Sequence, residues 1–363
     1  MKLNYFKTLF VAILVIFTIT TNAETYSGTC GTNVNWSLDT ETGLLKITGT
    51  GEMTSSPWES YNSSIKSVEI AEGVTSIESS AFSGCSGLTS VTIPNSVTSI
   101  GGFAFDGCSG LTGVYITDLA AWCNIDFYDY DSNPLYYVNK LYLNGTLVRK
   151  LEIPEGVTAI KKYVFYKLNT IRSVTIPNSV TSIGTGAFYG CSGLTSVTIP
   201  NSVTSIGRSA FEDCSGLTSV TIGSGVSEIG NDAFRYCSKL NSIYSLAEYP
   251  PLIYSNTFNN VDKTIPVYIP KGTKEDYEFE WSDFTNFIES DFTGIEDSNI
   301  STTEIKVIAG NGIDICNYYG KLQVINLAGQ VLKDTYVNGS AQITLPNGVY
   351  IVVIENYSQK IGV

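Results

Sequence analysis

The chain has 363 residues, with 21 Lys or Arg against 34 Asp or Glu, a formal net charge of −13, and no His. Without His, the Ser-His-Asp and Cys-His catalytic arrangements and His-ligated metal sites are excluded. The acidic balance makes nucleic acid and anionic membrane surfaces poor partners. We therefore expect no nucleic-acid partner and none of these catalytic chemistries.

Residues 1–23 have the pattern of a signal peptide. Lys2 and Lys7 precede an apolar run that ends near Ile19, and small residues lead up to Ala23. The alternative is a retained anchor, but the apolar run is short for a bilayer span, which needs about 20 residues. We predict cleavage between Ala23 and Glu24, no transmembrane span in the mature chain, and a location outside the cell or on its outer surface.

A 23-residue period dominates the next part of the chain. Phe82 and Phe105 are one period apart, and so are Phe165, Phe188, Phe211 and Phe234. Self-similarity at such a period is typical of solenoids, whose repeats cannot bury their apolar faces alone.

Each repeat opens with apolar residues at its first, fourth and sixth positions, as in Leu194, Val197 and Ile199. The alternation predicts a short strand. A proline then ends it, and the pair Val203 and Ile206 predicts a second extended segment on the opposite side. The expected fold class is mainly β, a solenoid with a parallel strand ladder.

One insertion interrupts the period, because Phe105 and Phe165 are 60 residues apart. It spans residues 117–146, looks like a variant repeat, and is rich in aromatic side chains: Trp122, Phe127, Tyr128, Tyr130, Tyr136, Tyr137 and Tyr142. Two interpretations remain open. The aromatic residues form a second local core, or they hold a sugar or a protein loop.

The sequence patterns of the flanking segments predict two caps and one further domain. Residues 24–63 alternate like a hairpin and would cap the repeats of residues 64–262. Residues 263–292 would close the far end, with core aromatic and aliphatic residues at helical spacing at Tyr277, Trp281, Phe284 and Ile288. Residues 294–363 contain strand-like runs separated by glycine turns, which predict a small β-sandwich.

The repeats resemble the BspA-like family of bacterial leucine-rich repeats, whose signature LxxLxIPxxVxxIgxxAFxgCxx is matched across residues 64–262. The resemblance implies a curved solenoid with its strand ladder on the concave side. It also implies a surface protein linked to adhesion rather than catalysis.

The C-terminal segments 325–331 and 345–350, with Lys360 near the end, resemble the sorting domain of type IX secretion. That family is recognised by the outer-membrane export machinery and is often removed. An immunoglobulin-like accessory domain is the alternative.

The sequence provides little support for carboxylate catalysis or for calcium binding. Carboxylates at Asp126, Asp129, Asp131 and Glu152 could in principle act as a pair, but nothing fixes their separation. Residues 126–133 lack the glycine and the closing glutamate of an EF-hand loop, so we expect a solvated loop. We expect no enzyme, no cofactor and no metal site.

The chain has eight Cys, and five of them share one repeat position: Cys85, Cys108, Cys191, Cys214 and Cys237. An even count in an exported chain favours disulfides. However, side chains stacked in register point parallel rather than toward each other. We therefore predict a buried ladder of free thiols.

The second, third and fifth positions of each strand should face the concave surface, where most side chains are hydroxyls repeated from rung to rung. The departures are Arg149, Lys150, Glu152 and Arg172, near Tyr115. Together with Trp122 of the insertion, these are the expected ligand-binding residues: Tyr115, Trp122, Arg149, Lys150, Glu152 and Arg172.

The functional hypothesis is a monomeric secreted or surface interaction protein that binds an extracellular protein or glycan. A carbohydrate-capture protein that uses the insertion aromatics is the alternative. Ice or mineral binding by the Thr rows is a third.

Overall fold

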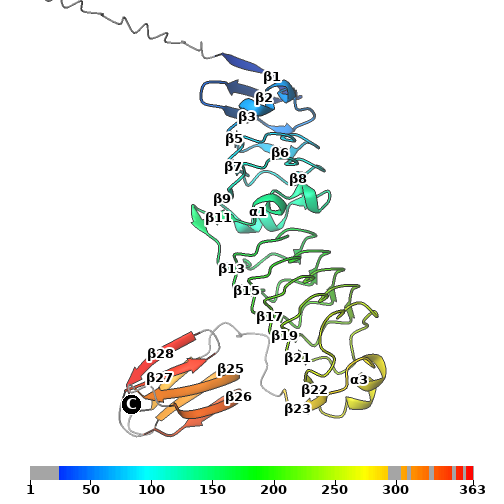
Figure 1. Ribbon diagram of the computed structural model, residues 1–363, viewed down its shortest axis with the longest axis vertical. Helices are drawn as coiled ribbons and strands as arrows, with labels where there is room; N and C mark the ends of the chain where they lie inside the picture. The colour runs from blue at the N-terminus through cyan, green and yellow to red at the C-terminus, as the bar shows by residue number, and fades with distance from the viewer. Residues whose placement is uncertain are drawn as a thin grey trace, which may run out of the picture.

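The computed structural model describes residues 24–292 and, further on, residues 304–308, 312–326, 331–345, 349–354 and 357–362. The predicted signal peptide lies outside the described residues, so cleavage between Ala23 and Glu24 stays a prediction. Residues 24–292 form an elongated stack of short strands, with two ladders on opposite sides (Figure 1).

The first ladder contains the strand that opens each repeat. Its members are β3 (Leu44–Gly49), β5 (Ser67–Ile70), β7 (Ser90–Thr92), β9 (Gly113–Ile116), β11 (Leu141–Leu143), β13 (Lys150–Glu152), β15 (Ser173–Thr175), β17 (Ser196–Ile199), β19 (Ser219–Ile222), β21 (Ser242–Ser245), β22 (Val267–Pro270) and β23 (Phe287–Ser290). Neighbours within each sheet pair in parallel, as Val197 does with Val220, whereas β11 and β13, and β15 and β17, are not paired as strands. The predicted parallel ladder is confirmed.

The second ladder contains the shorter segment that follows each proline turn. Its strands are β4 (Gly51–Glu52), β6 (Val74–Ile77), β8 (Ser99–Ile100), β10 (Asp126–Phe127), β14 (Ala159–Ile160), β16 (Ser182–Ile183), β18 (Ser205–Ile206) and β20 (Glu228–Ile229). Ile206, predicted to lie on this side, is buried and pairs with Ile183 and Ile229.

Apolar side chains from both ladders fill the space between them. The repeated phenylalanines stack in a column: Phe188 and Phe211 have ring centroids 5.1 Å apart, and Phe211 and Phe234 are 5.3 Å apart. All three are fully buried. Each ring covers its neighbours from water, so a single repeat could not stay folded alone.

The two ends of the stack are closed by additional elements. At the N-terminal end, β1 (Thr25–Gly31) and β2 (Val34–Asp39) extend the first ladder as an antiparallel sheet, followed by the 3-10 helix η1 (Glu59–Ser64). At the other end, α3 (Lys274–Glu280) and the turn after it bury Tyr277, Trp281 and Phe284 over the last rung.

The expected helical spacing in this C-terminal cap was wrong for Ile288. The helix ends at Glu280, and the chain then straightens into β23. A strand alternates its side chains between two faces. Phe287 is therefore buried, while Ile288 is 38% exposed.

The insertion contributes α1 (Leu119–Cys123), η2 (Tyr130–Ser132) and α2 (Leu135–Val138), and then interrupts the stack. β12 (Thr146–Leu147) turns back antiparallel on β11, and β13 pairs only with β15. The second ladder stops at β10 and resumes at β14. Within residues 24–292, no backbone-to-backbone hydrogen bond joins residues 24–148 to residues 150–292.

We call this break in backbone pairing, between residues 148 and 150, the gap. Side chains connect the two parts of the stack across it. The Trp122 indole donates to the Val164 carbonyl at 3.0 Å, and the Asn133 amide donates to the carbonyls of Tyr163 and Val164. Lys161 and Lys162 donate to carbonyls of the insertion at 2.8 and 2.9 Å. The two parts of the stack are thus joined by side-chain donors and apolar packing.

The C-terminal region has five described strands: β24 (Glu304–Ile308), β25 (Gly312–Asn326), β26 (Val331–Ile343), β27 (Val349–Ile354) and β28 (Tyr357–Gly362). All five belong to one antiparallel network, in which β25 pairs with β24, β26 and β27. The strand-like runs predicted within residues 294–363 are present as these strands.

Candidate binding face of the first ladder

The threonines at the second repeat position are engaged by the scaffold. At the second repeat position, Thr89 donates its hydroxyl to the Lys66 carbonyl at 3.1 Å, and Thr112 to the Thr89 carbonyl at 2.9 Å. Thr195 and Thr218 repeat this bond farther along. A hydroxyl whose only proton is bonded to the backbone has little left to donate to a ligand.

The same bond recurs in the second ladder, where Thr98, Thr181 and Thr204 donate to the carbonyl one repeat earlier. These two rows are therefore part of the hydrogen bonding that holds the rungs together, which argues against ice or mineral binding by them. This reason does not apply to the fifth-position row of Thr92, Thr198 and Thr221.

Tyr115 forms an aromatic pair with Tyr142 on the outer face. Their rings stack with centroids 4.7 Å apart and an interplanar angle of 12°. Both rings lie against Gly113, where an added Cβ would come within 2.8 Å of Tyr142 and 3.1 Å of Tyr115. Equivalent strand positions carry serine, as at Ser90. The glycine thus makes room for the tyrosine pair.

Four cations gather beside this pair. Arg149, Lys150 and Arg172 are exposed as predicted, and so is Lys140. Lys150 forms an ion pair with Glu152 at 2.6 Å. The structure brings all the predicted residues of β9–β15 to one face.

Two members of this face were missed in the sequence. Tyr142 was counted only as an insertion aromatic, although Leu141-Tyr142-Leu143 has the same alternation as Val114-Tyr115-Ile116. Lys140 precedes that strand directly.

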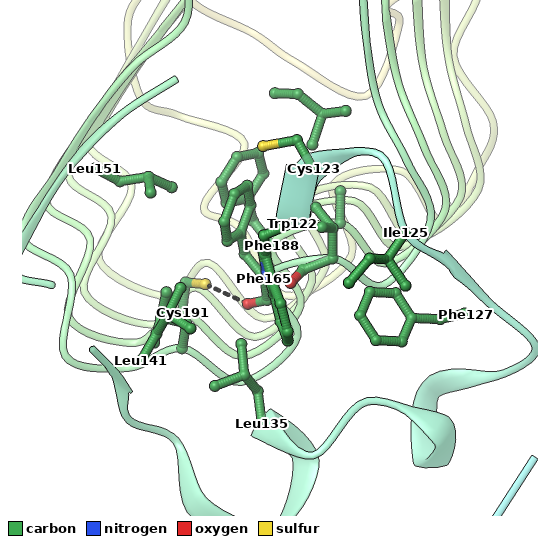
Figure 2. Close-up of a cluster of buried hydrophobic side chains, with 14 of the residues drawn as sticks. Trp122, Cys123, Ile125, Phe127, Leu135, Leu141, Leu151, Phe165, Phe188 and Cys191 are labelled. Carbon is green, nitrogen blue, oxygen red and sulfur yellow. Dashed lines mark hydrogen bonds between the residues drawn. The ribbon is translucent and has the colours of Figure 1, made fainter. Parts of the chain in front are cut away.

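Trp122 does not belong to this face, and its expected role in ligand binding was wrong. Its side chain is 1% exposed and packs edge-on against Phe127. Figure 2 shows it among buried side chains from both sides of the gap, including Leu151 and Phe165. The alternative interpretation, a local core, describes Trp122 and Phe127.

The expected solvated loop at residues 126–133 was also wrong in part. Asp131, Ser132 and Asn133 are buried. Burial raises the pKa of Asp131 above its ordinary value, and Asn133 uses its amide to bridge the gap. The segment is a structural connection between two rungs.

The thiols at the shared repeat position are buried and unpaired, as predicted. Cys191 donates to the Phe165 carbonyl at 3.3 Å, and Cys214 and Cys237 make the same bond one and two repeats later. Burial raises the pKa of Cys237 to about 12. Such thiols act as small apolar core groups rather than as nucleophiles. The side chain of Cys316 lies outside the described residues.

Within the part of the chain that the structure describes, no three side chains of the metal-ligating types come together. None of the described helices has the length and apolar character needed to cross a bilayer.

Stacked short repeats with two strand ladders, a phenylalanine column and a thiol column define a leucine-rich repeat solenoid. The chain belongs to the BspA-type leucine-rich repeat family: the family described as BspA type Leucine rich repeat region matches it in 6 copies, over residues 59–133, 137–265 and 214–319. Proteins of this family are in general surface or secreted interaction proteins and not enzymes.

Several solved structures are similar to this chain. A leucine-rich repeat protein from Eubacterium ventriosum has 18% identity, covers 66% of this chain and 95% of its own, and has a TM-score of 0.30. The pneumococcal vaccine antigen PcpA has 13% identity, coverages of 73% and 99%, and a TM-score of 0.38. A leucine rich cell surface protein from Faecalibacterium prausnitzii has 19% identity, coverages of 73% and 95%, and a TM-score of 0.27. No curated protein sequence matches the chain.

Proposed function

We propose that this protein acts outside the cell or on its surface as an adhesion or interaction protein, and that it binds an extracellular macromolecule with the face formed by β9, β11, β13 and β15. One observation carries the proposal. The second-position threonines of the regular rungs are bonded to the scaffold, whereas Tyr115, Tyr142, Arg149 and Arg172 interrupt the repeat pattern together. Binding hot spots are enriched in Tyr and Arg.

A binding screen of the secreted protein against matrix proteins, mucin and a glycan array tests this proposal. The informative variant replaces both stacked tyrosines by the residue of the neighbouring rungs, Tyr115→Thr with Tyr142→Thr. The matched control is Tyr244→Thr, which disrupts the stacked pair of Tyr244 and Tyr268 far from the gap. We expect the double variant to lose binding and the control to keep it. No binding by the wild type, or equal loss in both, contradicts the proposal.

Carbohydrate capture by the insertion remains a second candidate, although Trp122 cannot serve it. Three aromatic side chains of this region are exposed: Phe103 by 57%, Tyr128 by 74% and Tyr130 by 41%. Aromatic faces of this kind suit the apolar faces of sugars. A glycan array with Tyr128→Ala would show loss of a specific sugar signal if this patch is the binding site.

The C-terminal region is proposed to direct export. The support is the sequence resemblance of segments 325–331 and 345–350 to type IX sorting domains. The intact mass of the secreted protein tests the proposal: loss of about the last 70 residues, or their covalent replacement, supports it, and an unprocessed C-terminus contradicts it.

A further inference from the structure

Positive charge is concentrated in one band of this acidic chain. Residues 24–139 contain two Lys and thirteen acidic residues, residues 140–172 contain seven Lys or Arg and two Glu, and residues 173–207 contain no charged residue. The chain as a whole has a net charge of −13. The band coincides with the gap in the strand ladders.

Three of the seven cations have a structural task on the side away from the first ladder. Lys161 pairs with Asp126 at 2.9 Å, Lys162 donates to a carbonyl of the insertion, and Lys167 lies 4.1 Å from the ring centroid of Tyr136. These lysines hold the insertion against the following rung.

The other four cations form what we call the basic strip: Lys140, Arg149, Lys150 and Arg172. All four side chains are exposed. Arg172 donates its backbone N–H to the Arg149 carbonyl at 2.7 Å, so the two arginines start neighbouring strands. The hairpin bond from Val148 to Leu141 places Arg149 opposite Lys140.

The basic strip costs the scaffold stability. At the position of Arg149 and Arg172, the neighbouring rungs have threonines that bond the backbone. Arginine gives up that bond and places like charges on adjacent strands, which is destabilising. Lys140, Arg149 and Arg172 form no ion pair within the described residues. The Arg172 guanidinium lies against Gly193 of the next rung, but no ion pair within the described residues accounts for these three charges, and we infer a ligand as the reason for them.

We propose that the basic strip, with the adjacent hydroxyls of Tyr115 and Tyr142, binds an anionic glycan whose chain carries sulfate or carboxylate groups. This inference rests on the proposed binding role of the same face. Guanidinium groups recognise both anions through paired N–H donors. The strip runs along the stack at the strand spacing of about 4.8 Å, which suits a chain with charges on successive sugars.

An acidic protein segment fits this face less well. The large apolar side chains that are more than one third exposed belong to other surfaces, such as Phe103, Tyr128 and Phe279. Protein hot spots need anchors of that kind in well-packed pockets. Tyr115 and Tyr142 are stacked on each other and only partly exposed, so the face offers charge and aromatic hydroxyls rather than a free apolar anchor.

The test measures binding of the intact secreted protein to heparin, to polygalacturonate, to neutral dextran and to polyglutamate. Heparin and polygalacturonate separate sulfate from carboxylate recognition, and polyglutamate represents an acidic protein. Arg172→Thr is compared with Lys66→Thr, which removes one charge from the same repeat position five strands earlier in the first ladder. Both variants introduce the residue of neighbouring rungs, and unchanged circular dichroism shows that they fold.

We expect binding to one or both anionic glycans, weakened about tenfold by Arg172→Thr and unaffected by Lys66→Thr. Binding should also weaken with added salt. Equal loss in both variants, or polyglutamate bound as tightly as the glycans, overturns the inference. If the anionic glycans do not bind but another ligand binds in a manner sensitive to Tyr115→Thr with Tyr142→Thr, the inference fails and the proposed function stands. If nothing binds, both fail.

Discussion

The gap between residues 148 and 150 should be the weak point of the stack, and Trp122 is the side chain that tests this. Its indole donates across the gap to the Val164 carbonyl, and its ring is 1% exposed. In a solenoid, total stability is close to the sum of repeat stabilities and of interfaces between neighbours. An interface without backbone hydrogen bonds therefore depends on the few side chains that cross it.

The expected loss can be worked out for two substitutions. Trp122→Phe removes one donor, but Val164 keeps the Asn133 amide at 3.2 Å, so its carbonyl is not left unpaired. The lost bond costs about 1 kcal/mol, and the space left by the smaller ring costs about 1 kcal/mol more. Trp122→Ala also removes the whole apolar contact and should cost about 3–5 kcal/mol.

Hydrogen exchange followed by mass spectrometry in increasing urea is the appropriate assay, because it reports on each part of the chain separately. We expect residues 24–148 and residues 150–292 to lose protection at more widely separated urea concentrations in Trp122→Ala than in the wild type. Trp281→Ala is the matched control. Trp281 is also fully buried and donates to a carbonyl, that of Pro251, but backbone pairing of β22 with β23 spans its site.

The control should destabilise the C-terminal cap without separating the two parts. The reasoning is refuted if Trp122→Ala shifts both parts together, as one cooperative unit, or if it behaves like Trp281→Ala.

Two further predictions concern the face and the core. Gly113→Ser should displace the stacked tyrosines, because a Cβ there would lie 2.8 Å from the Tyr142 ring. Ser196→Gly is the control. A crystal structure of Gly113→Ser with unchanged tyrosine rings would contradict the prediction. Alkali should destabilise the fold, because burial raises the pKa of four thiols to about 12: those of Cys85, Cys108, Cys123 and Cys237. Unfolded thiols titrate near pH 8.5, so the unfolded state loses these protons first and stability falls as the pH rises from about 9 toward 12. A urea midpoint of unfolding that stays constant between about pH 9 and pH 12 would contradict the prediction of alkaline destabilisation.

The periodic part of the fold could be predicted because each residue type has one task that recurs every 23 residues. Ile206 could be assigned to the second ladder from the proline before it and the glycine after it. The core position of Phe211 followed from its neighbours at the same spacing. In such an array, local pattern and tertiary contact carry the same information.

The insertion could not be predicted in this way. Trp122 is buried because the rung at Val164, 42 residues later, packs over it. No local pattern reports a contact of that range, and the same aromatic composition fits a surface or a core. Asp131 and Asn133 look like a polar loop for the same reason, although both are buried. Tyr142, in contrast, could have been found from the alternation of its own strand.

The gap and the basic strip occupy the same part of the stack, and this has a physical reason. At four rungs the threonine at the second position bonds the preceding rung, as Thr195 does. Next to the gap the first ladder is less regular: β15 and β17 are not paired as strands, and Val174 is only half-buried, whereas its equivalents Val197 and Val220 are buried. Charged side chains can therefore replace the scaffold residues there at the smallest cost.

It follows that Arg172→Thr should bind less well and fold more stably. The new hydroxyl can donate to the Arg149 carbonyl, as the Thr195 hydroxyl does to the Arg172 carbonyl at 3.3 Å. Such a bond contributes about 0.5–1.5 kcal/mol, and removal of a like charge from the adjacent strand adds about 0.2–1 kcal/mol. Urea unfolding should show the gain for Arg172→Thr, whereas Lys66→Thr should gain less because the residue opposite Lys66 on the adjacent strand is the uncharged Gly43. A loss of stability in Arg172→Thr would mean that arginine serves the scaffold, and the case for a ligand at the basic strip would lose its premise.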